Sequence, residues 1–96
     1  MGEQSSLVAQ HREAIAQTAR AHKAISIAVF GSVARGEENE GSDIDFLVEF
    51  EPGSSLFDLL HLHDDLEALL GRKVDVVSAG ALTERDEHIR HEAISL

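Results

Sequence analysis

Short apolar segments rich in β-branched residues alternate along this chain with stretches that have helical spacing. The strand-like segments are residues 25–30, 44–50 and 74–78. Helical spacing extends over residues 6–22, 55–70 and 83–96, and over a short stretch that begins at Ser32. This order favours a small sheet flanked by helices, an α/β or α+β domain, although the order alone does not give the strand directions.

The helix over 55–70 has the clearest boundaries of the four. Ser55 and Asp58 resemble a capping box, and Gly71 suits the left-handed position that ends a helix. Its expected buried stripe is Leu56, Leu59, Leu60, His63, Leu66 and Leu70. For the last helix, the expected buried side is Ile89, Ala93 and Leu96.

The length of 96 residues fits one domain, 1–96, without a linker. There are no cysteines, which excludes disulfides and thiolate–zinc sites. No apolar run approaches the roughly 20 residues that cross a bilayer, and the polar, acidic residues 1–7 do not resemble a signal peptide. We therefore expect a cytoplasmic protein that does not interact with membranes.

The net charge of −10, with only eight Lys and Arg residues, limits the possible partners. Phosphate backbones are bound through clusters of basic side chains, so direct binding to nucleic acid is not expected. A partner with a basic surface, or a ligand that arrives with metal cations, fits this charge better.

Gly31 and Ser32 stand where the first strand ends and a helix can begin. A glycine there lets backbone N–H groups approach a phosphate, the helix N-terminus adds partial positive charge, and the Ser32 hydroxyl can add a hydrogen bond. Turn chemistry and a helix cap explain the same two residues. Arg35 lies one helical turn from Ser32 and can reach the same phosphate, or remain a solvated surface residue.

Asp43 and Asp45 are two residues apart at the start of the second strand, so their carboxylates share one face. A bound Mg²⁺ offsets the repulsion between such groups, whereas at a solvent-exposed strand start both are simply hydrated. Asp75 interrupts the third strand, where an apolar residue is expected, and a buried charge there needs a partner. If the two strands are neighbours, the three carboxylates can hold two metal ions; an ion pair of Asp75 with Arg72 or Lys73 is the alternative.

The combined pattern, Gly31-Ser32-x-Ala34-Arg35-Gly36 followed by Ser42-Asp43-x-Asp45 and a later Asp75, resembles the DNA polymerase β-like nucleotidyltransferases. More narrowly, it is similar to the minimal nucleotidyltransferases, the MntA-like antitoxins encoded beside HEPN-domain toxins. The similarity also includes residues 43–50, 69–75 and 89–93, and covers about residues 8–96. Phe46 stands where this family is expected to have Leu.

This resemblance implies the polymerase β-like palm fold, with a small mixed sheet flanked by helices. It implies that Gly31 and Ser32 hold the triphosphate and that Asp43, Asp45 and Asp75 bind Mg²⁺. We also expect Arg35 and Ser42 to contact the nucleotide, the three aspartates to be catalytic, and two Mg²⁺ ions to be bound. It also implies transfer of AMP from ATP to a tyrosine of a partner HEPN ribonuclease, which is thereby silenced.

Two other functions remain open at this stage. The chain can neutralise a HEPN toxin by complex formation without catalysis, or it can adenylylate a small molecule or an RNA end. The acidic composition argues against RNA, and 96 residues leave little room for a small-molecule pocket. The six histidines are interpreted as surface or helix-end residues, because His61 and His63 diverge on a helix and no clear set of four ligands exists.

Overall fold

The computed structural model describes residues 3–31, 34, 43–81 and 87–96 and contains one mixed sheet of four strands. The strands are β1 (Ala24–Phe30), β2 (Ile44–Phe50), β3 (Val74–Ser78) and β4 (Ile94–Ser95). The helices are α1 (Glu3–Gln10), α2 (Arg12–Ala21), α4 (Leu56–Leu70), the 3₁₀ turn η1 (Ala79–Ala81) and α5 (Glu87–Glu92). The expected α+β class and mixed sheet are confirmed.

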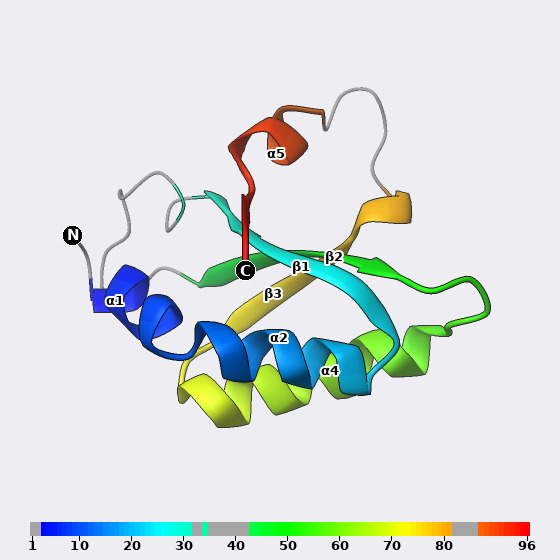
Figure 1. Ribbon diagram of the computed structural model, residues 1–96, viewed down its shortest axis with the longest axis horizontal. Helices are drawn as coiled ribbons and strands as arrows, with labels where there is room; N and C mark the ends of the chain where they lie inside the picture. The colour runs from blue at the N-terminus through cyan, green and yellow to red at the C-terminus, as the bar shows by residue number, and fades with distance from the viewer. Residues whose placement is uncertain (1–2, 32–33, 35–42, 82–86) are drawn as a thin grey trace.

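The strand order across the sheet is β3-β2-β1-β4. β1 pairs antiparallel with β2 and with β4, whereas β2 pairs parallel with β3. A parallel pair needs a crossover connection, and α4 provides it. Figure 1 shows α2 and α4 side by side below the sheet, with α5 above it. The described helices include none that is both long and apolar enough to cross a bilayer.

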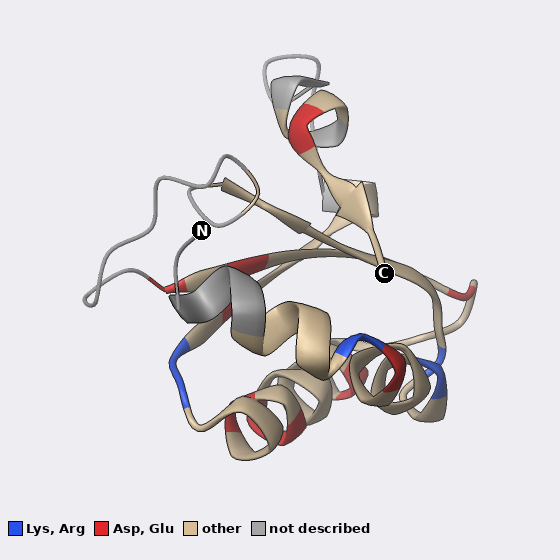
Figure 2. Ribbon diagram, turned by 60° about the vertical axis from the view of Figure 1, so that its left-hand side comes forward, with Lys and Arg blue, Asp and Glu red and all other residues tan. Residues whose placement is uncertain are grey.

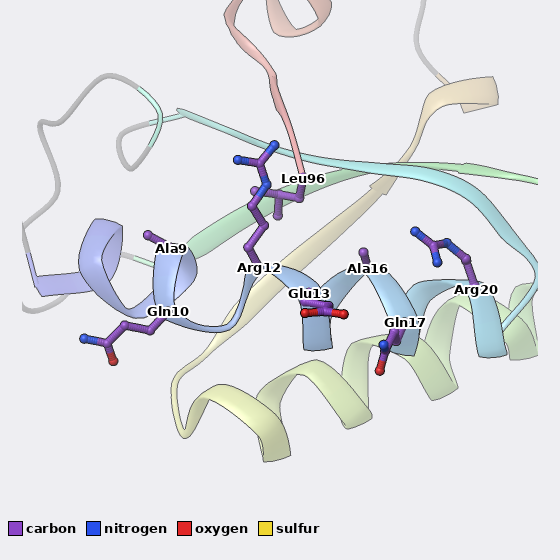
Figure 3. Close-up of a pocket in the computed structure, with 8 residues that line it drawn as sticks. All are labelled: Ala9, Gln10, Arg12, Glu13, Ala16, Gln17, Arg20 and Leu96. Atoms are coloured by element: carbon purple, nitrogen blue, oxygen red, sulfur yellow. The ribbon is translucent and has the colours of Figure 1, made fainter.

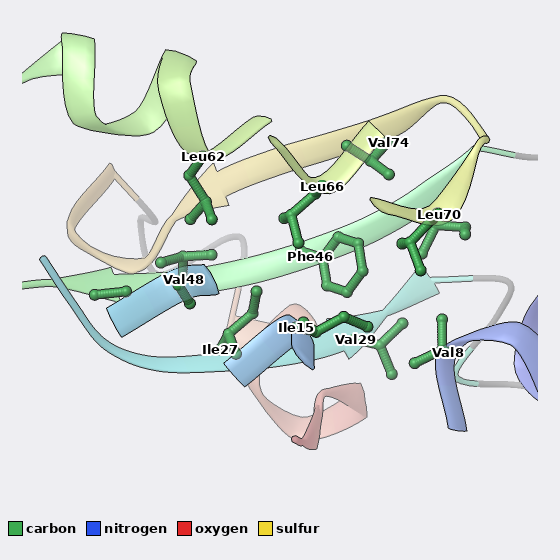
Figure 4. Close-up of a cluster of buried hydrophobic side chains, with 13 residues drawn as sticks. Val8, Ile15, Ile27, Val29, Phe46, Val48, Leu62, Leu66, Leu70 and Val74 are labelled. Carbon is green, nitrogen blue, oxygen red and sulfur yellow. The ribbon is translucent and has the colours of Figure 1, made fainter. Parts of the chain in front are cut away.

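The main core lies between the sheet and the pair α2 and α4. Its side chains converge from both layers in Figure 4. Phe46 and Val48 of β2 are fully buried there, together with Ile15 of α2 and Leu62 and Leu66 of α4. Since alternate residues of a strand point to opposite faces, the intervening residues of β2, Asp45 among them, face away from these helices.

The caps expected for α4 are both present. The Asp58 carboxylate accepts a hydrogen bond of 2.8 Å from the Ser55 backbone N–H, at the first turn. Gly71 ends the helix in the left-handed conformation with φ of 66°, and its N–H donates to the Glu67 carbonyl. These caps fix the length of the crossover between β2 and β3.

The expected buried stripe of α4 is wrong in part. Leu56 and Leu60 are 69% and 46% exposed, while Leu62, absent from the expected stripe, is fully buried. The helix is leucine-rich around its circumference, so its sequence fits more than one apolar stripe. The packing of Leu62, Leu66 and Leu70 against the sheet decides between these stripes.

The helix expected over residues 6–22 is two helices. His11 separates α1 from α2, with φ of −106° and ψ of 15°. The Leu7 carbonyl accepts a hydrogen bond from the His11 ring at Nδ1, 3.0 Å away. The interruption lets both segments follow the sheet, so that Val8 of α1 joins the same core as Ile15 of α2.

The last expected helix is also shorter than its spacing indicated. It ends at Glu92, and the following residues form β4, whose Ile94 pairs with Val29 of β1. Pairing with the open edge of β1 satisfies backbone groups that a helix would otherwise satisfy internally. Ile89 and Ala93 are half-buried against a second cluster, as expected, whereas Leu96 packs on the main core. The expected start at Thr83 lies outside the described residues.

Candidate active site

Carboxylates and a glycine turn form one row across three adjacent strands. In the parallel pair, Asp45 of β2 is the register partner of Asp75 of β3. In the antiparallel pair, Asp45 is the register partner of Phe30, the last residue of β1, which Gly31 follows directly. The sequence therefore places Gly31, Asp45 and Asp75 side by side once the strands are ordered β3-β2-β1.

This row lies on the sheet face that points away from α2 and α4. Ile44, Phe46 and Val74 belong to the helix-covered core, so their strand neighbours Asp45 and Asp75 project to the opposite face. Asp43 lies two residues before Asp45, just outside the strand, and is half-buried. Neighbouring carboxylates on one face are a suitable arrangement of hard oxygen ligands for divalent cations.

Gly31 is fitted closely to the Asp45 carboxylate. Its φ of +74° is in the left-handed region, which residues with a Cβ rarely adopt. A Cβ built on Gly31 would lie 2.4 Å from Oδ2 of Asp45 and 3.2 Å from Cγ. Only glycine therefore allows the turn and the Asp45 side chain to approach each other in this way.

Asp75 is exposed, contrary to the expectation of a buried charge within the third strand. β3 is the edge strand of the sheet, and residue 75 projects from the face opposite α4, so water reaches it. The alternative of an ion pair with Arg72 or Lys73 is not among the ion pairs found between described residues. The row thus supplies a hydrated, accessible carboxylate.

The three carboxylates are neighbours without being gathered around one point. Among the described residues, the potential ligand atoms that lie within 4.8 Å of one another belong to His63, Asp64 and Glu67 of α4. In that group, Nδ1 of His63 lies 3.3 Å from Asp64 and Nε2 lies 3.5 Å from Glu67. Glu67 also accepts a hydrogen bond of 3.1 Å from the backbone N–H of Val74. These contacts account for the group without an ion.

The remaining expected nucleotide-binding residues, Ser32, Arg35 and Ser42, lie outside the described residues, as does the helix expected at Ser32. Of the described histidines, His61 and His63 diverge as expected. His61 faces the ring of His22, with ring centroids 6.3 Å apart, and His63 faces Glu67.

One surface hollow is remote from the carboxylates. It measures about 470 Å³ and lies along the outer side of α1 and α2, where Figure 3 shows Arg12 and Arg20 on either side of Glu13. Of the predicted site residues that the structure describes, Gly31, Asp43, Asp45 and Asp75, none lines it. Because α2 covers the opposite face of the sheet, this hollow cannot serve the carboxylate row.

A smaller hollow of about 190 Å³ lies on the same face as the row. Its lining is Ser26, Ala28, Leu47, Glu49, Ala79, Ala93 and Ser95. Sequence reasoning did not select these residues. One feature of the sequence could have indicated the hollow: the first strand has small residues, Ser26 and Ala28, at alternate positions on one face. A sheet that is packed on both faces has larger side chains at such positions.

Comparison with known proteins gives matches along most of the chain. A protein adenylyltransferase, MntA, of Thermococcus cleftensis is 52% identical over 56 residues, which are 58% of this chain and 57% of that protein. The chain thus matches little more than half the length of such curated relatives.

Solved structures share the fold over a longer range. A structure described as a minimal nucleotidyltransferase superposes with a TM-score of 0.88 and 45% identity, covering 96% of this chain and 95% of the other. A toxin–antitoxin structure with AMP-PNP has a TM-score of 0.74 at 22% identity, covering 86% of this chain and 69% of the other, which shows a shared fold. The predicted resemblance to MntA-like minimal nucleotidyltransferases is thereby confirmed. Since the model of the nucleotidyltransferase domain family matches residues 8–95, the chain belongs to that family.

Proposed function

We propose that this chain is a Mg²⁺-dependent adenylyltransferase that acts as an antitoxin, transferring AMP from ATP to a tyrosine of a partner HEPN ribonuclease. The observation that carries the proposal is the row of Gly31, Asp45 and Asp75 across three strands, with Asp43 beside it. Relatives named as protein adenylyltransferases, and the likeness to toxin–antitoxin structures, support the same reaction and the same class of partner.

The donor set fits divalent magnesium. Asp43, Asp45 and Asp75 offer carboxylate oxygens on an accessible face, and Gly31 leaves the Asp45 carboxylate room that a Cβ would fill. When bound there with ATP, Mg²⁺ supplies charge neutralisation for the triphosphate and lowers the pKa of the attacking hydroxyl. Asp75 is the register partner of Asp45 across the parallel pair and is exposed, so its side chain has room to change rotamer toward an ion held there.

The transfer is an in-line displacement at the α-phosphorus of ATP. The tyrosine oxygen forms a bond to the α-phosphorus, the bond from that phosphorus to the oxygen bridging to the β-phosphate breaks, and pyrophosphate leaves with the electron pair. Asp75 accepts the proton of the phenol and passes it to water. Gly31 contacts the phosphates, since it directly adjoins the Asp45 side chain.

The charge of the chain suits a protein acceptor. Figure 2 shows acidic residues on α4 and on the strands, with basic residues confined to separate places among the described residues. With a net charge of −10, the surface attracts a basic partner and repels free nucleic acid. The acceptor hydroxyl therefore comes from another protein.

The test combines the purified chain with labelled ATP, Mg²⁺ and its HEPN partner. We expect the wild type to label the partner, and Asp45→Asn to reduce the rate about a thousandfold, because metal-bound charge stabilisation contributes several kcal/mol. Glu51→Gln, at an exposed turn away from the row, is the matched control and retains the wild-type rate. Equal labelling by wild type and Asp45→Asn would show that these carboxylates are not catalytic.

A second function, neutralisation of the toxin by complex formation alone, is favoured by one observation. The carboxylates of Asp43, Asp45 and Asp75 are not among the described side chains whose ligand atoms lie within 4.8 Å of one another. Under this alternative, Asp43→Asn/Asp45→Asn still protects cells from the toxin and still forms the complex. A variant that binds the toxin but fails to protect excludes it.

A further inference from the structure

The smaller hollow lies on the sheet face that α2 and α4 leave uncovered, called the open face below. It begins one side-chain position from the carboxylate row, and its lining is Ser26, Ala28, Leu47, Glu49, Ala79, Ala93 and Ser95. Leu47 follows Asp45 on the same face of β2, which places it roughly 7 Å further along the strand. Glu49 is the next residue on that face. A ligand whose phosphates lie at Asp45 and Gly31 therefore extends naturally into this hollow.

The strands that form the floor of the hollow carry mostly small side chains. Ala28 is the register partner of Leu47 on β2 and of Ser95 on β4, and Ser26 is the register partner of Glu49. Ala79 and Ala93 complete the walls. A floor of methyl groups and one leucine favours a planar apolar face lying parallel to the sheet.

The charges in the hollow select which part of a nucleotide enters it. Among the residues whose side chains the structure describes, its lining contains no Lys or Arg, and Glu49 is the one ionisable side chain. A carboxylate repels phosphate and accepts hydrogen bonds from N–H donors. At about 190 Å³, the hollow is also smaller than the roughly 300–1,000 Å³ of pockets that enclose whole drug-sized ligands. It suits one uncharged, planar group with an N–H donor on its edge.

We propose that this hollow is the nucleobase subsite of the enzyme, and that Glu49 selects bases with an exocyclic amino group, such as adenine. The inference rests on the proposed function, in which the triphosphate lies at the carboxylate row. Ala28 and Leu47 contact the face of the base, and Glu49, with the hydroxyls of Ser26 and Ser95, contacts its edge.

Binding of ATP and of inorganic tripolyphosphate to the full chain, measured calorimetrically with Mg²⁺, separates the base from the phosphates. Ala28→Leu fills the hollow, and we expect it to weaken ATP binding about tenfold while changing tripolyphosphate binding less than about twofold. Ala68→Leu, the same substitution at an exposed position of α4, is the matched control and leaves both affinities unchanged. Circular dichroism verifies that each variant is folded.

Glu49→Gln changes an exposed side chain and keeps the fold even if Ala28→Leu does not. The wild type is expected to bind ATP about tenfold more tightly than ITP, whose base has a carbonyl in place of the amino group, because hydrogen bonds to charged groups are the stronger ones. In Glu49→Gln this preference falls to about twofold or less, because the amide can donate as well as accept.

Three results would overturn the inference. If the wild type binds tripolyphosphate as tightly as ATP, the base contributes nothing to binding. If Ala28→Leu binds ATP as the wild type does, the base does not lie in the hollow. If Ala28→Leu binds ATP normally but no longer labels the protein acceptor, the hollow holds the acceptor side chain instead. Since binding is measured without any acceptor, failure of toxin labelling alone contradicts the proposed function and leaves this subsite standing.

Discussion

The two faces of the sheet differ in chemistry although they are built from the same strands. On one face, Phe46, Val48 and Ile44 are fully buried beneath α2 and α4. On the other, Asp45 is half-buried, Glu49 and Asp75 are exposed, and Leu47 and Phe30 form only a small cluster with Ala79. One face of the sheet therefore stabilises the fold, and the opposite face of the same strands offers polar groups to a ligand.

This separation allows acidic residues to sit in strands, where they are intrinsically unfavourable. The burial of alternate residues on the helix-covered face holds each strand in place, so the opposite positions need not contribute apolar surface. The same alternation means that substitutions one residue apart in β2 should affect different properties, stability or ligand binding.

The largest expected effect is on the helix-covered face. Leu62→Ala removes a fully buried side chain of α4, and we expect the free energy of unfolding to fall by about 3 kcal/mol. Leu60→Ala, on the same helix but 46% exposed, should cost less than about 1 kcal/mol. Urea denaturation followed by circular dichroism measures both. Equal losses would mean that α4 does not use this face against the sheet.

On the open face, Gly31→Ala should damage activity more than stability. The added Cβ displaces the Asp45 carboxylate, and a misplacement of about 1 Å can reduce catalysis roughly a hundredfold. Gly71→Ala is the matched control, because its φ of +66° brings the same backbone strain with nothing within 4 Å of the added Cβ. AMP transfer and thermal melting are measured for both, and an equal loss of transfer would contradict the assigned role of Gly31.

A smaller effect is expected at the paired carboxylates. Asp75→Asn removes one of two like charges adjacent across the parallel pair, and we expect the metal-free protein to gain about 0.5 kcal/mol of stability. Wild type should melt at a higher temperature with Mg²⁺ than with EDTA, because ligands that bind the native state stabilise it. The variant should lose most of this difference. Identical Mg²⁺ responses of both proteins would argue that Asp75 does not hold the ion.

The smallest effect concerns pH and the start of α4. The hydrogen bond from the Ser55 backbone N–H, followed by the charge of Lys23, holds the pKa of Asp58 below its usual value of 3.8. Since the folded-state pKa is the lower one, this carboxylate stabilises the fold above pH 3.8, and the contribution is lost as the pH falls through the folded value. Asp58→Asn should therefore lower the urea midpoint at about pH 7 but little at about pH 2. The same difference at both pH values would contradict the cap.

Strong local signals made most of the fold predictable from sequence. β1, β2 and β3 lie within one residue of the expected strands, and both caps of α4 are where Ser55, Asp58 and Gly71 indicated. The segments that differ depend on contacts distant in sequence. Ile94 and Ser95 form a strand because β1 has an open edge, and no local pattern encodes that edge.

The residues of the candidate site were predictable from the sequence. Their arrangement was predictable only on the assumption that the second and third strands are neighbours. The i, i+2 spacing places Asp43 and Asp45 on one side of the chain, but their approach to Asp75 required β2 and β3 to be neighbours, which the sequence leaves open. The hydration of Asp75 could not be predicted, because it depends on β3 being an edge strand. The small residues that line the hollow form no recognisable sequence motif. Their effect is to leave a volume unfilled, and a sequence pattern does not show such a volume.

The parallel pairing of β2 and β3 has a consequence for the newly made chain. Asp75 can align with Asp45 only after α4 has crossed over and docked on the sheet, because a tight turn cannot join parallel strands. A ribosome-bound chain that ends before Val74 carries the glycine turn and two of the acidic groups, but lacks the third. Under the proposed function, incompletely synthesised chains do not transfer AMP from ATP. The ability to modify a target arises only when the tertiary structure is complete.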